Sequence, residues 1–284
     1  MRFLFTALAL FLAVPAAAEP AMWRVANATT EIILFGTVHE LPEGTTWLTP
    51  RIQQRFDAAD ALVLETVVPD DRSVIGQLIT RMGYSPREPK LITRVAPSRR
   101  GLLLPQVREV GLPIEALDAM ETWYAAVALG DAAVSRIGLD PALGVEPILT
   151  ARARTMKKPI TGLETPEQQL GYFDNLPETD QRAMLDSTLD DMRTAKTDTA
   201  NLIAAWLKGD TNALAADFAK SMRATPRLAS VLVTERNARW ANWVEARLKL
   251  PGKVFIAVGA AHLTGRDSVQ AMLAAKGIKV ERLP

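Results

Sequence analysis

The chain contains no cysteine among its 284 residues. This absence excludes disulfide bonds, thiolate nucleophiles and thiolate metal ligands, so nitrogen and oxygen atoms must bind any metal. Beyond residue 18, no stretch approaches the ~18 consecutive apolar residues that a membrane helix needs. Positive and negative charges are nearly balanced, with 33 Lys and Arg residues and 32 Asp and Glu residues. A formal net charge of +1 without long basic runs argues against nucleic acid as a partner.

The first 18 residues have the pattern of a secretory signal peptide. Met1-Arg2 precedes the apolar run Phe3–Val14, and small residues up to Ala18 indicate a cleavage site. The run is too short to span a bilayer comfortably, and a lipoprotein anchor would require a cysteine. We therefore expect a periplasmic or secreted protein with no membrane anchor after cleavage, and a single domain over residues 19–284.

Strand-like segments lie near both ends of the chain, and helical periodicity fills the middle. Residues 30–35 and 61–67 flank a helix expected from Thr49-Pro50, an order typical of a βαβ unit. Later strands are expected at residues 158–164, 253–258 and 278–283, a helix capped by residues 264–267, and a long helix at residues 227–250. The sequence thus predicts an α/β fold whose mixed central sheet is formed by N- and C-terminal segments, with a large helical insert at residues 71–155 and 177–249.

The only two histidines end matching tetrapeptides, Gly36-Thr37-Val38-His39 and Gly259-Ala260-Ala261-His262. Each tetrapeptide follows an apolar, strand-like run, and open α/β sheets bind ligands beyond the ends of their strands. Imidazole is well suited to metal ligation and to proton transfer near neutral pH. A single histidine of this kind would be an ordinary residue satisfied by a local hydrogen bond. The matching contexts favour one shared site, in which each glycine lets the backbone approach closely.

Four further polar residues occupy positions where an apolar or surface role is expected. Glu65 ends a buried strand and needs a partner, because an unpaired buried charge costs several kcal/mol. Glu164 also follows a strand, although an acid beside a helix start is favourable by itself. Asn237 lies on the apolar face of the helix at residues 227–250, with Arg236 at the border of that face. Arg236 could neutralise either glutamate in a structural pair, or polarise a substrate carbonyl.

Several common catalytic motifs are missing from the sequence. It has no Gly-x-Ser-x-Gly elbow, no Gly-x-x-x-x-Gly-Lys-Ser/Thr loop and no His-Glu-x-x-His helix. These absences remove the commonest serine hydrolase, nucleotide-binding and zincin interpretations.

Five segments, in this order, resemble the TraB/GumN family. They are Gly36–His39, Leu64–Thr66, Lys158–Thr165 with Gln168, Glu235–Asn237 with Trp240-Ala241, and Ala257–Leu263. That family includes the animal TIKI Wnt-inactivating proteases and is distantly similar to the erythromycin esterase and ChaN groups. The resemblance covers essentially the whole mature chain. It implies a metal-dependent, hydrolase-like site made by His39, Glu65 and His262, with Glu164 and Arg236 at further family positions.

The function expected on this basis is that of an exported metal-dependent hydrolase, a TIKI-like metallopeptidase acting on an amide or ester bond of a peptide or small molecule. His39, Glu65 and His262 would bind a divalent ion such as Mn²⁺, Co²⁺ or Zn²⁺. Glu164 would act as base and Arg236 would support the oxyanion, with Asn237 beside it. Two alternatives stay open: a metal-independent hydrolase with a histidine base oriented by Glu65, and a non-catalytic periplasmic haem or metal carrier. The oligomeric state is left open by the sequence.

Overall fold

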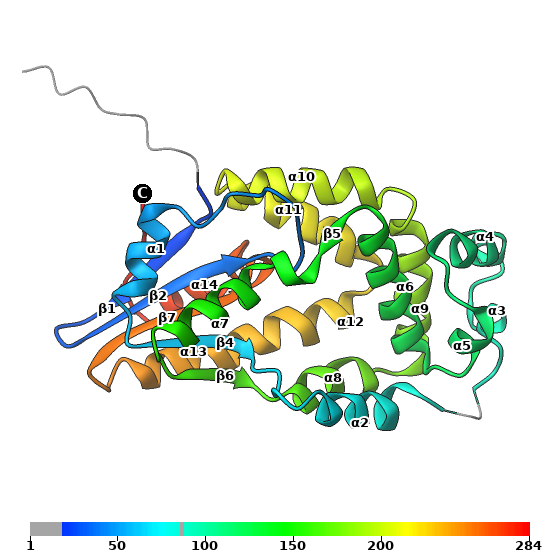
Figure 1. The fold of residues 1–284 in the computed structure, drawn as a ribbon, viewed down its shortest axis with the longest axis horizontal. Helices are drawn as coiled ribbons and strands as arrows, with labels where there is room; N and C mark the ends of the chain where they lie inside the picture. The colour runs from blue at the N-terminus through cyan, green and yellow to red at the C-terminus, as the bar shows by residue number, and fades with distance from the viewer. Residues whose placement is uncertain (1–18, 86–87) are drawn as a thin grey trace, which may run out of the picture.

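A six-stranded mixed β-sheet occupies one half of the molecule, and helices extend beyond its strand ends (Figure 1). The computed structural model describes residues 19–85 and 88–284, so the predicted signal peptide lies outside the described residues. The strands of the sheet are β1 (Met22–Ala26), β2 (Thr30–Thr37), β4 (Ala61–Thr66), β6 (Ile160–Glu164), β7 (Gly252–Gly259) and β8 (Val280–Arg282). Their order is β6-β4-β7-β2-β1-β8. The first four in this order are parallel, whereas β1 is antiparallel to both of its neighbours.

This arrangement confirms the predicted α/β fold with a mixed sheet built from both ends of the chain. A short separate pair is formed by β3 (Leu41–Pro42) and β5 (Leu139–Asp140). The late strand β7 lies between the early strands β2 and β4. Such parallel neighbours have their carboxyl ends at the same edge of the sheet.

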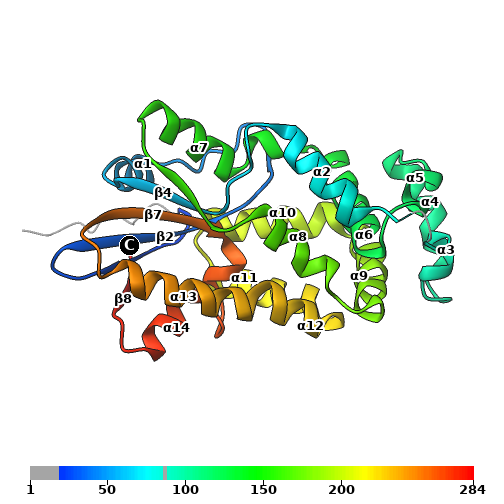
Figure 2. The ribbon, with the colours of Figure 1, turned by 90° about the horizontal axis from the view of Figure 1, so that it is seen from below.

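Helices cover both faces of the sheet, and the side chains of β7 alternate between the two faces. Phe255 and Ala257 pack towards α1 (Pro50–Asp57) and α7 (Val145–Thr155) in one apolar cluster. Val254, Ile256 and Val258 pack towards α13 (Glu235–Arg247) and α14 (Val269–Ala275) in another. Figure 2 shows α1 and α7 on one side of the strands and α13 and α14 on the other. The central strands are therefore buried on both faces, which explains their continuous apolar sequences.

The predicted helical insert is also confirmed. Within residues 71–155 its helices are α2 (Arg72–Gly83), α3 (Leu91–Arg94), α4 (Arg100–Val110), α5 (Ile114–Asp118), α6 (Thr122–Arg136) and α7. Within residues 177–249 they are α9 (Glu178–Asp191), α10 (Ala195–Leu207), α11 (Thr211–Ser221), α12 (Pro226–Ala229) and α13; helix α8 (Pro166–Asp174) lies between the two parts. A third apolar cluster is formed by residues of α3, α4, α5, α6 and α9. It lies at the end of the molecule remote from the sheet (Figure 1). Within residues 19–85 and 88–284, no helix is both long and apolar enough to cross a membrane.

Local capping signals located two helix starts correctly and one incorrectly. Thr49 caps α1, and Thr165 with Gln168 forms a capping box at α8. The predicted cap at residues 264–267 is wrong, because α14 begins after Ser268, whose hydroxyl accepts from the amide of Ala271. The hydroxyl of Thr264 instead donates to the carbonyl of Ala261 and closes the short 3₁₀ helix η4 (Ala260–Leu263).

The long helix predicted at residues 227–250 is interrupted near its start. Residues Ser230–Thr234 form a π-helical turn, η3, between α12 and α13. Such widened turns are rare and occur often at functional sites. Here the turn directly precedes Arg236 and Asn237.

Candidate functional site

The carboxyl ends of β2, β4 and β7 bring His39, Glu65 and His262 together. His39 follows the end of β2, Glu65 is the penultimate residue of β4, and His262 lies in η4 directly after β7. All three surround the backbone of Gly259. A Cβ atom at position 259 would lie 3.1 Å from Glu65 Oε1, 3.6 Å from His262 Cδ2 and 3.7 Å from His39 Nε2. The three residues that the sequence assigns to one site are therefore neighbours.

The two Gly-x-x-His tetrapeptides pack against each other. In the parallel pairing of β2 with β7, Gly36 is opposite Val258 and Thr37 is opposite Gly259. A Cβ atom at position 36 would lie 3.1 Å from the Cα atom of Ala260, within the second tetrapeptide. Gly36 thus makes room for the second motif, and Gly259 makes room for Glu65.

Arg236 connects the two glutamates and His262 in the buried part of the site. Its Nε donates to the carboxylate of Glu164 at 3.0 and 3.1 Å, and its Nη2 donates to Glu65 Oε2 at 2.6 Å and lies 2.8 Å from Glu164 Oε2. Its Nη1 donates to the carbonyl of Leu232 at 3.2 Å and lies 3.2 Å from His262 Nε2. All three guanidinium nitrogens therefore contact acceptors within the site. This arrangement favours a positioning role for Arg236 over the oxyanion role predicted from the sequence.

Glu164 is saturated with donors. Besides Arg236, the hydroxyl of Tyr172 donates to its Oε1 at 2.8 Å, and the indole N–H of Trp240 does so at 3.2 Å. The guanidinium of Arg236 lies over the rings of Tyr172 and Trp240, which adds cation–π attraction. These contacts with three side chains suit a role of Glu164 in fixing Arg236 better than a role as base.

His262 is held as a neutral imidazole with a defined tautomer. The side-chain amide of Asn237 donates to the carbonyls of Asp267 and His262, so its Oδ1 accepts from His262 Nδ1 at 2.7 Å. The lone pair of Nε2 then points to Arg236. Burial lowers the pKa of His262 to about 4; Glu65 opposes this shift and Arg236 supports it. Asn237 is therefore a residue that orients His262.

Glu65 is a buried carboxylate that stays ionised. Burial opposes its ionisation, but His262, Arg236, His39 and the amide of Gly259 lower its pKa to about 2. Because His262 is neutral at neutral pH, Arg236 is the buried cation that stabilises Glu65 there. The Gly259 amide donates to Oε1 at 2.7 Å, and the Gln169 side chain of α8 donates to Oε2 at 3.1 Å.

His39 has a different environment, exposed on one side and paired with a carboxylate on the other. Its side chain is 67% exposed, and its Nδ1 lies 2.7 Å from Glu146 Oε1. Attraction to Glu146 raises the pKa of His39 to about 9, against the opposing effects of desolvation and Arg236. The hydroxyl of Thr37 also donates to Glu146. Nδ1 is therefore occupied, and Nε2 is the nitrogen that faces Gly259.

Glu146 was missed by the sequence interpretation. It lies in the first turn of α7, where an acidic residue is common and carries little information. Its position is set by the preceding residues, since the amide of Val145 donates to the carbonyl of Val38 at 3.1 Å. Gly144 permits this approach, because a Cβ atom there would overlap the carbonyl of His39. Gly144 could not have pointed to Glu146 from the sequence alone, because its contact with His39 is visible only in the structure.

Residues 21–282 match the sequence model of the TraB/PrgY/gumN family. The chain belongs to this family. Two relatives, each with the name "Uncharacterized protein YbaP", come from Escherichia coli strain K12 and Shigella flexneri. Each is 26% identical over 244 residues, which cover 84% of this chain and 86% of the relative. No solved structure matches the chain. The family resemblance predicted from the five sequence segments is thus confirmed.

In this TraB/PrgY/gumN family member, the predicted metal ligands converge without forming a ligand set. Among residues 19–85 and 88–284, no three His, Asp or Glu side chains are grouped closely enough to hold a metal ion. Glu65 Oε2 accepts from Arg236, and the lone pair of His262 Nε2 faces the same guanidinium. As they lie, His39, Glu65 and His262 do not fit a three-ligand site, and their metal role stays a prediction.

Two cavities meet at the site of this family member. The strand-end cavity, of about 290 Å³, is lined by both tetrapeptides, Glu65, Arg236 and residues of α11. The α8 cavity, of about 490 Å³, lies on the other side and is lined by His39, Glu65 and Arg236 as well. These three residues therefore separate two spaces that a ligand could occupy together.

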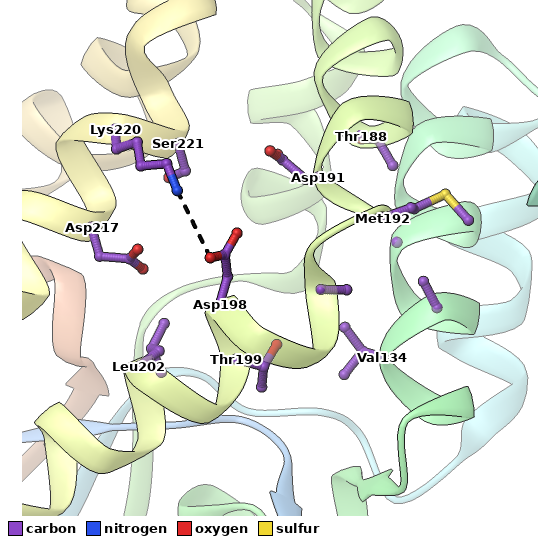
Figure 3. Close-up of a pocket in the computed structure, with 13 residues that line it drawn as sticks. Val134, Thr188, Asp191, Met192, Asp198, Thr199, Leu202, Asp217, Lys220 and Ser221 are labelled. Atoms are coloured by element: carbon purple, nitrogen blue, oxygen red, sulfur yellow. Dashed lines mark ion pairs between the residues drawn. The ribbon is translucent and has the colours of Figure 1, made fainter. Parts of the chain in front are cut away.

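A third cavity adjoins the strand-end cavity. It has a volume of about 360 Å³, lies between α6, α9, α10 and α11, and shares Leu202, Asp217 and Ser221 with the strand-end cavity. Figure 3 shows Asp191, Asp198 and Asp217 directed towards it, with Lys220 paired to Asp198. The helical insert thus supplies walls next to the site.

Proposed function

We propose that the protein hydrolyses an amide or ester bond, with His39 as the general base. The observation that carries this proposal is the contact of His39 Nδ1 with Glu146, which leaves Nε2 facing Gly259 next to Glu65 Oε1. A carboxylate on one ring nitrogen fixes the tautomer and stabilises the imidazolium that forms when the other nitrogen accepts a proton. This is the metal-independent alternative, with Glu146 instead of Glu65 as the orienting carboxylate.

The reaction follows the usual course of base-assisted hydrolysis. A water molecule hydrogen-bonded to His39 Nε2 and Glu65 Oε1 gives a proton to Nε2 as its oxygen forms a bond to the substrate carbonyl carbon. His39 then returns the proton to the leaving nitrogen or oxygen as the bond to that atom breaks. The amides of Ala260 and Ala261 begin η4, lack partners within that short helix and line the same cavity, so we assign them to the oxyanion.

The buried residues have positioning roles in this proposal. Arg236 keeps Glu65 ionised, and Glu164 fixes Arg236 from the opposite side. Asn237 orients His262, whose Nε2 completes the set of acceptors around the guanidinium. Their loss would weaken catalysis through misplacement of Glu65.

The direct test measures hydrolysis by chelator-treated protein against a panel of peptides and nitrophenyl esters. We expect turnover by the wild type and a loss of about 10²- to 10⁴-fold in His39→Ala, the usual contribution of general acid–base catalysis. Leu104→Ala, at an exposed position of α4, serves as the control and should retain full activity. No turnover of any panel member, or full turnover by His39→Ala, would contradict the proposal.

A metal-dependent hydrolase is the second candidate. One observation favours it: His39 Nε2, Glu65 Oε1 and His262 all face the backbone of Gly259. Metal analysis of the purified protein, before and after chelation, discriminates between the candidates. A stoichiometric divalent ion that is required for turnover, and is lost in both His39→Ala and His262→Ala, would select the metal-dependent version.

Export is part of the same proposal. We infer that residues 1–18 direct the chain to the periplasm or the medium, where a peptide or small molecule would be the substrate. Fractionation of expressing cells and N-terminal sequencing of the mature protein test this inference. We expect a mature N-terminus near Glu19, and full-length protein retained in the cytoplasm would contradict export.

A further inference from the structure

The α8 cavity differs in character from the strand-end cavity. Six apolar side chains form much of its wall: Leu64, Val68, Pro147, Leu170, Phe173 and Leu232. The charged residues that border it are occupied with one another, because Glu146 is paired with His39 and Glu65 is paired with Arg236. The wall that remains for a ligand is therefore chiefly apolar.

The walls of this cavity come from elements that the rest of the site already fixes. Leu64 precedes Glu65 in β4, Pro147 follows Glu146 in α7, and Leu232 supplies the carbonyl that accepts from Arg236. The ring of Phe173 in α8 stacks on Trp123 at 5.9 Å between ring centres. Figure 1 shows α8 next to α2, beyond the end of β6. The apolar surface is thus held in place before a ligand binds.

We propose that the α8 cavity binds a large apolar group next to the scissile bond. The substrate class is accordingly a peptide or acyl amide with a leucine- or phenylalanine-like side chain at that position. A volume of about 490 Å³ lies within the ordinary range of ligand pockets and accommodates such a group. Continuity with the reacting atoms is given by His39, Glu65 and Arg236, which line this cavity and the strand-end cavity alike. The hydrolytic part of this inference rests on the proposed function.

Binding of two uncleaved compounds tests the cavity independently of catalysis. Phenylalaninol and ethanolamine differ by one benzyl group, and neither contains an amide or ester bond. We expect the wild type to bind the benzyl compound at least about tenfold more tightly by ligand-observed NMR, since burial of an aromatic side chain gives at least that factor. Equal binding of the two compounds would overturn the proposal.

Two variants locate the binding to the α8 cavity. Val68 is 50% exposed at its rim, so Val68→Trp should fill the cavity without disturbing the core and should weaken the benzyl compound about tenfold. Leu104→Trp, at another exposed apolar position, is the matched control and should bind like the wild type. Leu170→Ala, which enlarges the cavity, should shift the preference from phenylalaninol to the larger tryptophanol analogue.

The outcomes separate this proposal from the proposed function. A benzyl preference that survives Val68→Trp and is unchanged by Leu170→Ala would overturn the α8 assignment, whatever hydrolysis is found. A preference removed by Val68→Trp in a protein that cleaves no amide or ester would support the α8 cavity and contradict the hydrolase. Hydrolysis of the panel without preference for large apolar side chains would support the hydrolase and contradict the role of the α8 cavity.

Discussion

His39 and His262 end identical motifs but have opposite environments. The ring of His39 is exposed and its Nδ1 contacts a carboxylate, so its charged form is favoured. The ring of His262 is buried between an amide and a guanidinium, so its neutral form is favoured. Two residues of the same type at matching strand ends therefore have different tasks: His39 can exchange protons with solvent and substrate, whereas His262 is a fixed acceptor.

The first prediction concerns the pH dependence of turnover. Under the proposed function His39 must be neutral to accept a proton, and Glu146 raises its pKa to about 9. The kcat/KM of the metal-free protein should therefore rise with pH between 6.5 and 9. Glu146→Gln removes the cause of the shift, so the midpoint of this rise should move down towards the ordinary histidine value of about 6.5 while kcat falls. Rate profiles of both proteins between pH 5 and 10 measure this change. An unmoved midpoint would exclude His39 as the titrating base.

The second prediction concerns Gly259. A Cβ atom at this position would lie 3.1 Å from Glu65 Oε1 and 3.7 Å from His39 Nε2, where the proposal places the attacking water. Gly259→Ala should therefore reduce kcat by at least about 100-fold, a loss like that of the base itself. Steady-state kinetics measure the loss, and circular dichroism checks that the fold is kept. Wild-type kcat in this variant would refute the placement of the water.

Residue type and chain position predicted most of the candidate site. The two histidines and Glu65 were identifiable because each departs from an apolar strand at the edge where parallel strands end. Helical periodicity placed Asn237 on a buried face and Arg236 at its border. In the structure both side chains are buried. Glu146 was not identifiable, because its role depends on a contact between residues about a hundred positions apart.

At the scale of secondary structure, the turn η3 and helix α13 act as one support for Arg236. The carbonyl of Leu232 in the π-helical turn accepts from Nη1, and the next residue along α13, Asn237, orients His262. A regular continuation of the helix was expected from periodicity, since a π turn has no distinct sequence pattern. Cap residues were better signals because their side chains bond locally, as at Thr49 and Thr165.

The third prediction concerns the packing of β2 on the start of η4. Gly36→Ala would place a Cβ atom 3.1 Å from the backbone of Ala260, so we expect the free energy of unfolding to fall by about 1–3 kcal/mol. Gly76→Ala is the matched control, because Gly76 lies in α2 with no atom within 4 Å of an added Cβ. That variant should raise the free energy of unfolding by about 0.5–1 kcal/mol. Chemical denaturation measures both, and equal effects of the two substitutions would contradict the packing argument.

At the scale of the whole molecule, the chain folds its two ends into one sheet and places the helical insert beyond the strand ends. This architecture was predictable because most apolar strand patterns lie near the two ends, whereas helical periodicity fills most of the middle around the strand at residues 160–164. The order of the strands was not, because the pairing of β7 with β2 and β4 joins segments about two hundred residues apart. Sequence patterns predict local structure, whereas strand order depends on contacts between residues far apart in the chain.

The fourth prediction concerns the stability of the metal-free protein as a function of pH. The pKa of His262 is lowered to about 4, so its contribution to the free energy of unfolding is present above pH 6.5 and is lost as pH falls from 6.5 through 4. The pKa of His39 is raised to about 9, so its contribution is present below pH 6.5 and is lost as pH rises through 9. We therefore expect these two groups to give a stability maximum near pH 6.5.

Urea denaturation at pH 4.5, 6.5 and 9 measures this maximum. His39→Ala should flatten the alkaline side and leave the acidic side unchanged, whereas His262→Ala should do the opposite. Stability that continues to increase from pH 6.5 to 9 in the wild type would contradict the shift assigned to His39.

The central place of β7 has a consequence for the timing of biosynthesis. Chains emerge from the ribosome N-terminus first, at about 5–20 residues per second, and β7 begins only at Gly252 of 284 residues. The early strands β2 and β4 are neighbours of β7 and not of each other, so they lack a common pairing partner until β7 has been made. The arrangement of His39 beside Glu65 consequently requires β7. The proposed activity would therefore arise only after β7 has been made and has paired with both early strands.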